Sequence, residues 1–122
     1  MNSLSVITML LGRILLAALF AAGAVQKFVS PTGAQTLLAA QGWPTLLVWP
    51  ALALNALGAI SLGTGILITP MALVLALYCM VTSLFHFIPH DPWQMSIFVK
   101  NWAISGGLLV LFAHQLDRAR EK

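Results

Sequence analysis

Four long apolar stretches dominate the sequence and set its fold class. They cover residues 4–29, 44–68, 71–87 and 95–113. A helix needs roughly 20 apolar residues to cross the hydrocarbon core of a bilayer, so each stretch is about long enough to cross once. Because a spanning backbone must satisfy its own polar groups, the pattern predicts an all-α fold. We expect a single domain, residues 1–122, built as an antiparallel bundle of four transmembrane helices.

The scarcity of charge excludes the other broad classes of protein. The 122 residues include only six Lys or Arg and three Asp or Glu, which is 7% of the chain. A soluble domain carries roughly a quarter charged residues, so a soluble enzyme is excluded. A disordered chain needs low hydrophobicity, whereas the mean hydropathy here is +0.94. The basic residues form no run with interleaved aromatics, so we expect a lipid bilayer and no nucleic acid as partner.

The connections between the apolar stretches are short. Residues 31–42 are half apolar and too few to cross, so they predict a short interfacial segment that begins at Pro31 and stops at Gly42. A tight connection at Thr69 and Pro70 makes the second and third spans an antiparallel hairpin. The segment HFIPHDPWQ (86–94) is the one compact polar loop, since its prolines prevent helix continuation.

The basic residues favour one orientation by a narrow margin. Four crossings place both termini on one side, together with Arg118, Arg120 and Lys122, whereas Lys27 and Lys100 belong to the opposite side. Positive residues favour the cytoplasmic side, so we expect both termini in the cytoplasm. Four tryptophans fall near the outer interface, where such rings either anchor the bundle or line a ligand site: Trp43, Trp49, Trp93 and Trp102.

Arg13 is the most informative single residue. It lies inside the first apolar stretch, about 14 Å along a helix from Leu4, which argues against a cleaved signal peptide. An arginine at that depth costs on the order of 3 kcal/mol even on the lenient insertion scale. If the hairpins are aligned, one polar group from each other span reaches the same depth and faces the bundle interior: Asn55, Thr82 or Ser83, and Ser105.

Three interpretations of Arg13 remain open. No acidic residue occurs between positions 1 and 90, so the guanidinium has no nearby carboxylate partner in the chain. It is either a structural group hydrogen-bonded to helix carbonyls, Asn55 and water, or a binding group for an anionic or carbonyl-bearing ligand such as a quinone. In the third interpretation it extends to the inner interface.

A second group of polar residues gathers at the outer ends of the spans: Gln26, Lys27, His86, His90, Asp91, Lys100 and Asn101. The spacing of His86 and His90 is that of a helical metal pair, but Pro89 pushes the preceding residue out of the helical region. Further ligands are lacking as well, so we expect no metal site. A histidine and a lysine close to a carbonyl could exchange protons near neutral pH; otherwise these are ordinary interfacial residues.

Taken in order, the segments resemble the DoxX family of small four-helix bacterial and archaeal membrane proteins. The resemblance rests on LGRILLAALFAAGAVQKF (11–28), on a second span with one polar residue, and on FVKNWAISGGLLVLF (98–112). It implies a multi-pass protein of the plasma membrane. The founding member is similar to a subunit of a thiosulfate:quinone oxidoreductase, and other members are linked to thiol or quinone stress.

The resemblance also marks residues. The polar positions of the family fall on Arg13, Lys27, Lys100 and Asn101, with Gly106 and Gly107 as packing positions. Many members carry a glutamate in the second span, where this chain offers Asn55. Without that acid, an intramembrane proton relay is in doubt, and Arg13 keeps its charge for a ligand or another subunit.

Three functions follow from these observations, in this order of preference. The first is an accessory subunit of a quinone-linked redox or stress-response system, whose ligand-binding residues are Arg13, Lys27, Asn55, His86, Lys100, Asn101 and Ser105. The chain carries no motif for a covalently bound cofactor, for flavin, haem or an iron–sulfur cluster, so a partner redox protein would hold the redox centre. The second is a small-molecule permease, which requires a homo-oligomer because four helices leave little room for a pathway. The third is a structural or assembly partner of other membrane proteins.

Overall fold

The computed structural model describes residues 2–121, and within that range the chain is entirely helices and their connections. Its long helices are α1 (Ser3–Val29), α3 (Val48–Thr64), α4 (Ile68–Ser83) and α5 (Pro92–Arg120). Shorter elements are α2 (Thr32–Ala40) and the single 3-10 turns η1 (Thr45–Leu47) and η2 (Leu84–His86). With the adjoining 3-10 turns included, four helices are long and apolar enough to cross a membrane. The predicted all-α bundle of four spanning helices is confirmed.

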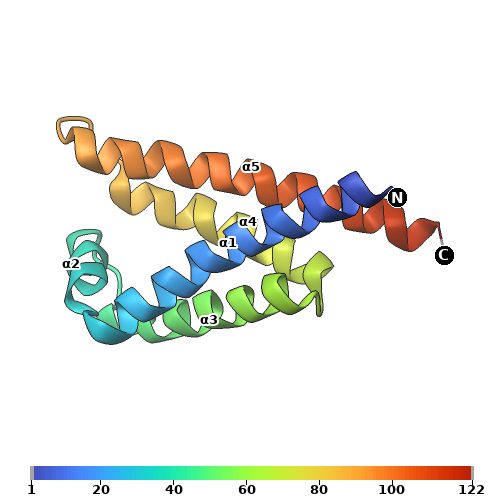
Figure 1. Cartoon of the computed structure of the whole chain (residues 1–122). Helices are drawn as coiled ribbons and strands as arrows, with labels where there is room; N and C mark the ends of the chain where they lie inside the picture. The colour runs from blue at the N-terminus through green and yellow to red at the C-terminus, as the bar shows by residue number, and fades with distance from the viewer. Residues whose placement is uncertain (1, 122) are drawn as a thin grey trace.

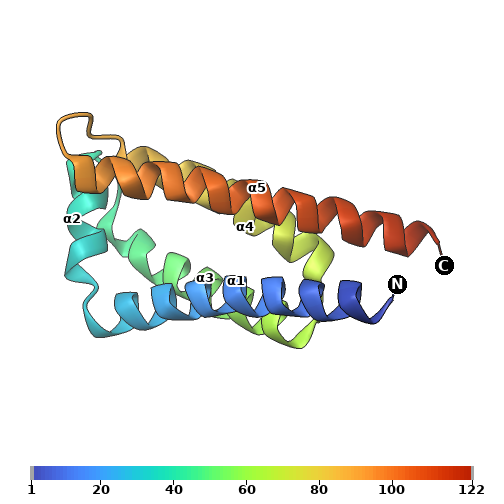
Figure 2. The same cartoon turned by 45° about the horizontal axis from the view of Figure 1, so that its top comes forward.

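The long helices are arranged as two pairs. Helix α1 packs along α3, and α4 packs along α5, whereas the contact of α3 with α4 is smaller. Figure 1 shows that successive long helices run in opposite directions and that both ends of the described chain lie at the same end of the bundle. Helix α2 lies across the opposite end, as Figure 2 shows, where the sequence predicts an interfacial segment.

Glycine and proline set the helix ends, not always where the sequence analysis puts them. Helix α3 ends at Thr64, because Gly65 adopts a left-handed backbone with φ of 88°. The predicted connection at Thr69 and Pro70 is therefore wrong: Pro70 lies in the first turn of α4, where its missing N–H needs no partner. Helix α5 likewise begins at Pro92 instead of residue 95, after Asp91 accepts hydrogen bonds from two backbone N–H groups of its first turn.

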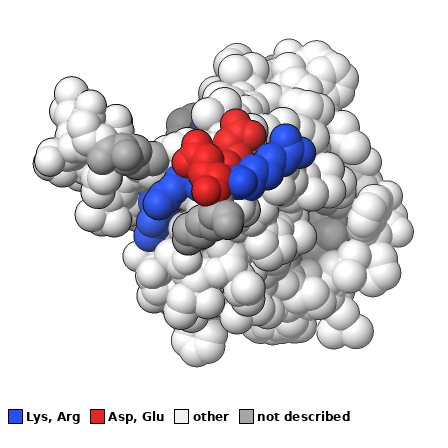
Figure 3. All heavy atoms as spheres, turned by 90° about the vertical axis from the view of Figure 1, so that its right-hand side faces the viewer, with Lys and Arg blue, Asp and Glu red and all other residues white. Residues whose placement is uncertain are grey.

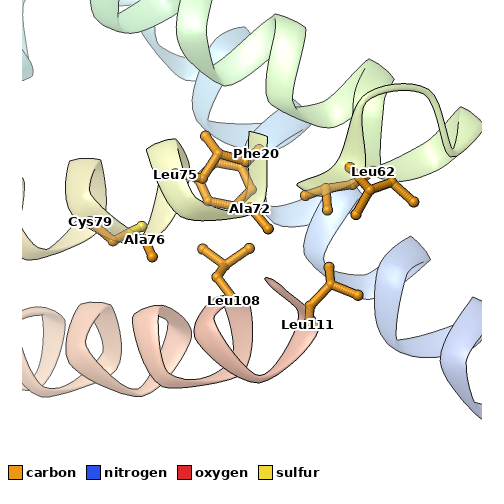
Figure 4. Close-up of a cluster of buried hydrophobic side chains, with 9 residues drawn as sticks. Phe20, Leu62, Ala72, Leu75, Ala76, Cys79, Leu108 and Leu111 are labelled. Atoms are coloured by element: carbon orange, nitrogen blue, oxygen red, sulfur yellow. The ribbon is translucent and has the colours of Figure 1, made fainter. Parts of the chain in front are cut away.

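A small apolar core lies where the two pairs meet. Figure 4 shows Phe20 of α1 and Leu62 of α3 facing side chains of α4 and α5 across this space. Leu62, Leu75 and Leu108 are fully buried there. Most other apolar side chains of the four helices are exposed, as expected for a bundle whose outer surface faces lipid.

Charged and aromatic residues mark the two ends of the bundle. Figure 3 looks onto the end that holds the termini and shows acidic and basic side chains gathered there on an otherwise uncharged surface. The charged residues near the end of α5 are Asp117, Arg118 and Arg120 on the helix and Glu121 directly after it. At the opposite end Trp43 meets Phe85 edge to face, with ring centroids 5.3 Å apart, and so links the loop before α3 to the end of α4.

Helices α1 and α5 are longer than α3 and α4, and this difference shapes the terminal end. In both views the first turns of α1 and the last turns of α5 continue past the connection between α3 and α4 (Figures 1 and 2). Gly65 in that connection lies against Arg13, so about three turns of α1 precede the level at which α3 ends. Beyond this level α1 and α5 are the long helices that remain.

Candidate functional site

Arg13 is anchored to the end of α3. Its Nε donates a hydrogen bond of 3.0 Å to the carbonyl oxygen of Leu62. That carbonyl is one of the last four of the helix, which lack a partner within it, and a cation there also meets the negative end of the helix dipole. The guanidinium lies over Gly65, where a Cβ would be 3.2 Å from Nη2. The structure thus gives Arg13 the bond to a helix carbonyl that the first interpretation expects.

A cavity of about 770 Å³, widely open to its surroundings, lies between the N-terminal half of α1 and the C-terminal half of α5. Its wall is mostly apolar, and the nitrogen-bearing side chains on it are Arg13 and His114. The residues that line it are Leu4, Ser5, Thr8, Met9, Gly12, Arg13, Leu16, Gly107, Val110, Leu111 and His114. Arg13 therefore has two contacts: its Nε binds the end of α3, and its side chain borders this cavity.

His114 is the residue that the sequence analysis missed. Its Nε2 is buried and has no hydrogen-bond partner among the described residues. Such a group is rare, because leaving a buried polar atom unpaired costs about 1–3 kcal/mol. A sequence signal did exist, since His114 is the only ionisable side chain between Lys100 and Asp117. The apolar stretch that predicts the fourth span ends at residue 113, so His114 falls just outside the predicted span.

Asn55 does not share a level with Arg13, contrary to the sequence prediction. A Cβ on Gly23 would lie 3.2 Å from Asn55 Nδ2, so Asn55 faces α1 at Gly23. Gly23 is ten residues from Arg13, about 15 Å along the helix. The assumption of aligned hairpins fails because α3 ends beside Arg13, which leaves its middle opposite the second half of α1.

Asn55 instead joins α3 to α4. Its amide is 4% exposed, and the hydroxyl of Tyr78 donates a hydrogen bond of 3.3 Å to its Oδ1. Ser105 of α5 donates to the carbonyl oxygens of Ala76 on α4, at 3.0 Å, and of Asn101 on its own helix, at 2.9 Å. Asn55 and Ser105 thus meet α4 within one turn of each other, away from Arg13.

The side-chain hydroxyls of Thr82 and Ser83 on α4 donate hydrogen bonds to carbonyl oxygens of the same helix. Thr82 Oγ1 donates to the carbonyl oxygen of Tyr78 at 2.9 Å, and Ser83 Oγ donates to that of Met80 at 2.6 Å. The predicted layer with one polar group from each span around Arg13 is therefore not formed.

The second group of polar residues lies at the other end of the bundle from Arg13. His86 Nδ1 and Gln94 Oε1 are 2.6 Å apart, which ties the end of α4 to the start of α5. Lys27 is half-buried and Lys100 is exposed. Lys27 is fourteen residues from Arg13, about 21 Å along α1, so these residues and Arg13 belong to separate sites.

The residues 2–121 contain no group of three His, Cys, Asp or Glu side chains placed to hold a metal ion. His90 is exposed in the loop before α5, where Asp91 accepts hydrogen bonds from the N–H groups of Trp93, at 3.0 Å, and Gln94, at 3.3 Å. The carboxylate therefore serves as the helix cap.

Comparison with known proteins agrees with this architecture. The family model described as DoxX matches residues 8–88, more than half of the chain, from the first third of α1 to the loop after α4. Helix α5, with Lys100, Asn101 and His114, lies beyond the matched range. No curated protein and no solved structure matches the chain. With four apolar helices and a family match over most of its length, the chain belongs to the DoxX family of multi-pass membrane proteins.

Proposed function

We propose that the protein is an accessory subunit of a quinone-linked redox or stress-response system in the membrane, and that the cavity between α1 and α5 receives the quinone. One observation carries the proposal: Arg13, a cation without a carboxylate partner nearby in the sequence, borders a mostly apolar cavity of about 770 Å³. Small-molecule sites are typically 300–1,000 Å³ in volume, mainly apolar, with a few polar groups that fix orientation.

A quinone has the chemistry that such a site would recognise. Its ring carbonyl oxygens accept hydrogen bonds, and the guanidinium of Arg13 is a donor that never accepts. Only Nε of Arg13 is bonded to Leu62, so the terminal nitrogens can donate to a ligand. The apolar tail of a quinone would lie against the leucine, methionine and valine side chains of the wall.

The partner that would hold the redox centre needs a contact surface within the membrane. Gly106 on α5 supports this part of the proposal, because a Cβ there would meet nothing within 4 Å among the described residues. Small residues allow close approach of helices, and no helix among the described residues approaches Gly106 in this way. A second copy of this chain, in a homo-oligomer, is the alternative partner for this surface.

We further propose that the protein lies in the plasma membrane of a bacterial or archaeal cell with both termini in the cytoplasm. The ends of α1 and α5 lie at the same end of the bundle, where Arg118 and Arg120 are exposed. Positive residues near the ends of spans favour the cytoplasmic side.

The proposal is tested by purifying the protein in mild detergent and measuring quinone in the bound lipid by chromatography. We expect quinone enriched over the membrane extract, and a roughly tenfold loss on Arg13→Gln, because a hydrogen bond from a charged group contributes about 1.5–3 kcal/mol. Arg118→Gln, an exposed arginine outside this cavity, is the matched control and should retain the quinone. Equal quinone in Arg13→Gln and the parent, with both monodisperse, would reject the site.

A further inference from the structure

The binding of a carbonyl group by Arg13 does not account for His114, the other nitrogen-bearing side chain on the cavity wall. Its ring borders the same cavity as Arg13, from the opposite helix. Its Nε2 is buried without a partner among the residues 2–121. A buried polar atom of this kind is normally paired with protein, water or a ligand.

Other polar groups on this wall do not satisfy the imidazole. Thr8 Oγ1 donates its proton to the carbonyl oxygen of Leu4 at 2.7 Å. Arg13 carries donors only and is held at the end of α3. The remaining wall is largely aliphatic, so a molecule that fills the cavity is the partner available to His114, and its oxygen reaches the buried Nε2 once the imidazole ring turns toward the cavity.

The two side chains differ in what they can bind. The guanidinium only donates, so it favours an oxygen that accepts, as in the oxidised quinone. A neutral imidazole donates through one nitrogen and accepts through the other, so it can also accept a hydrogen bond from a hydroxyl, as in the reduced quinol. An arginine alone can donate to the oxygen of either form but leaves the hydroxyl proton of the quinol without an acceptor, so such a site would favour the oxidised form.

We propose that His114 is the second binding residue for the quinone head group and that it allows the site to hold the quinol as well as the quinone. This inference rests on the function proposed above and specifies it further. The site is then suited to a ligand that arrives as the quinone and leaves as the quinol, or the reverse: the redox centre of the partner subunit supplies or takes up the two electrons, and the two protons come from or go to water. His114 and Arg13 bind the oxygens of the head group in either state.

The test uses the whole protein in phosphatidylcholine nanodiscs, titrated without oxygen with decylubiquinone and, separately, with its quinol. We expect His114→Phe, which keeps a ring and removes both nitrogens, to weaken quinol binding at least fivefold and quinone binding less. Arg13→Gln should do the reverse. His114→Gln keeps a donor and an acceptor and should retain most of the quinol affinity. His90→Gln, in the exposed loop, is the matched control.

A second measurement separates contact from a structural role. In protein labelled with ¹⁵N-histidine, one ring-nitrogen resonance should shift on addition of quinol, and that resonance should be absent from His114→Phe. The His90→Gln variant should keep it.

The possible results distinguish the two proposals. Binding of both forms that depends on Arg13 but not on His114 would overturn the role of His114 and leave the proposed function standing. No binding of either form by the parent protein would reject both. If palmitate binds more tightly than the quinol and shifts the same resonance, the cavity is a fatty-acid site and the quinol assignment is wrong.

Discussion

Leu75 of α4 leaves no room for a side chain on Gly58 of α3: a Cβ there would lie 2.8 Å from Leu75 Cδ1. Leu75 is fully buried in the core between the helix pairs, so its side chain cannot move aside freely. The smallest possible residue is thus required where α3 and α4 cross. The contact between these two helices is limited, and Gly58 and Leu75 are part of it.

Gly58→Ala should therefore destabilise the fold by about 1–3 kcal/mol, the usual cost of an added methylene in a packed core. Gly63→Ala, on the same helix, is the matched control, since its Cβ would meet Ala17 Cβ at an ordinary 3.9 Å. Reversible unfolding in mixed detergent micelles measures both. Equal stability of the two variants would show that α3 and α4 do not approach this closely.

The Arg13 anchor is tested at Gly65. Gly65→Ala should cost about 1–2 kcal/mol for a left-handed backbone, and more because its Cβ would lie 3.2 Å from Arg13 Nη2. Gly42 also has a positive φ, 75°, but a Cβ there meets nothing within 4 Å among the described residues. The excess loss of stability in Gly65→Ala over Gly42→Ala reports the contact with the guanidinium. No excess would place Arg13 away from the end of α3.

The link between Asn55 and Tyr78 should be weak but measurable. A double-mutant cycle of Asn55→Ala and Tyr78→Phe should give a coupling of about 0.6 kcal/mol, the average for hydrogen bonds between membrane helices. Combining Asn55→Ala with Ser105→Ala should give additive losses, because Ser105 bonds to Ala76 and Asn101 instead. Coupling in the second cycle as large as in the first would indicate one shared polar layer.

The orientation depends on a small excess of basic residues at the termini. A cytoplasmic reporter fused after α5 should be active in the parent protein, and removing the charges of Arg118, Arg120 and Lys122 should lower its activity. Removing Lys27 and Lys100 instead should leave the reporter active. A periplasmic reporter that is active in the parent protein would reverse the proposed orientation.

The fold was predictable because hydropathy and chain breakers act locally. Each apolar run is long enough to cross, and Pro31 and Gly42 bracket α2 as expected. The end of α3 was misplaced because Thr69 and Pro70 look like a turn, whereas Gly65 is the residue that takes the left-handed backbone. Sequence alone does not decide between a proline that breaks a helix and one that begins it.

The site was less predictable because it depends on the relative lengths of the helices. Equal helices would have placed Asn55 beside Arg13, but α3 ends at the level of Arg13, and Asn55 reaches Gly23 instead. His114 became part of the site because α5 continues past the residue at which its apolar run was expected to end. Which residues of different helices lie at the same level is decided by how the helices assemble, and the local sequence does not show it.

The unequal helix lengths give the terminal end a different mechanical character from the rest of the bundle. Beyond the connection at Gly65, helices α1 and α5 continue on either side of the cavity, without α3 or α4 between them. A spanning helix adjusts its tilt to the thickness of the surrounding bilayer at only a modest energetic cost. Longer or shorter acyl chains in the surrounding lipid will therefore change the spacing of α1 and α5 at this end, and with it the volume of the cavity. The packing of the core will change only after that.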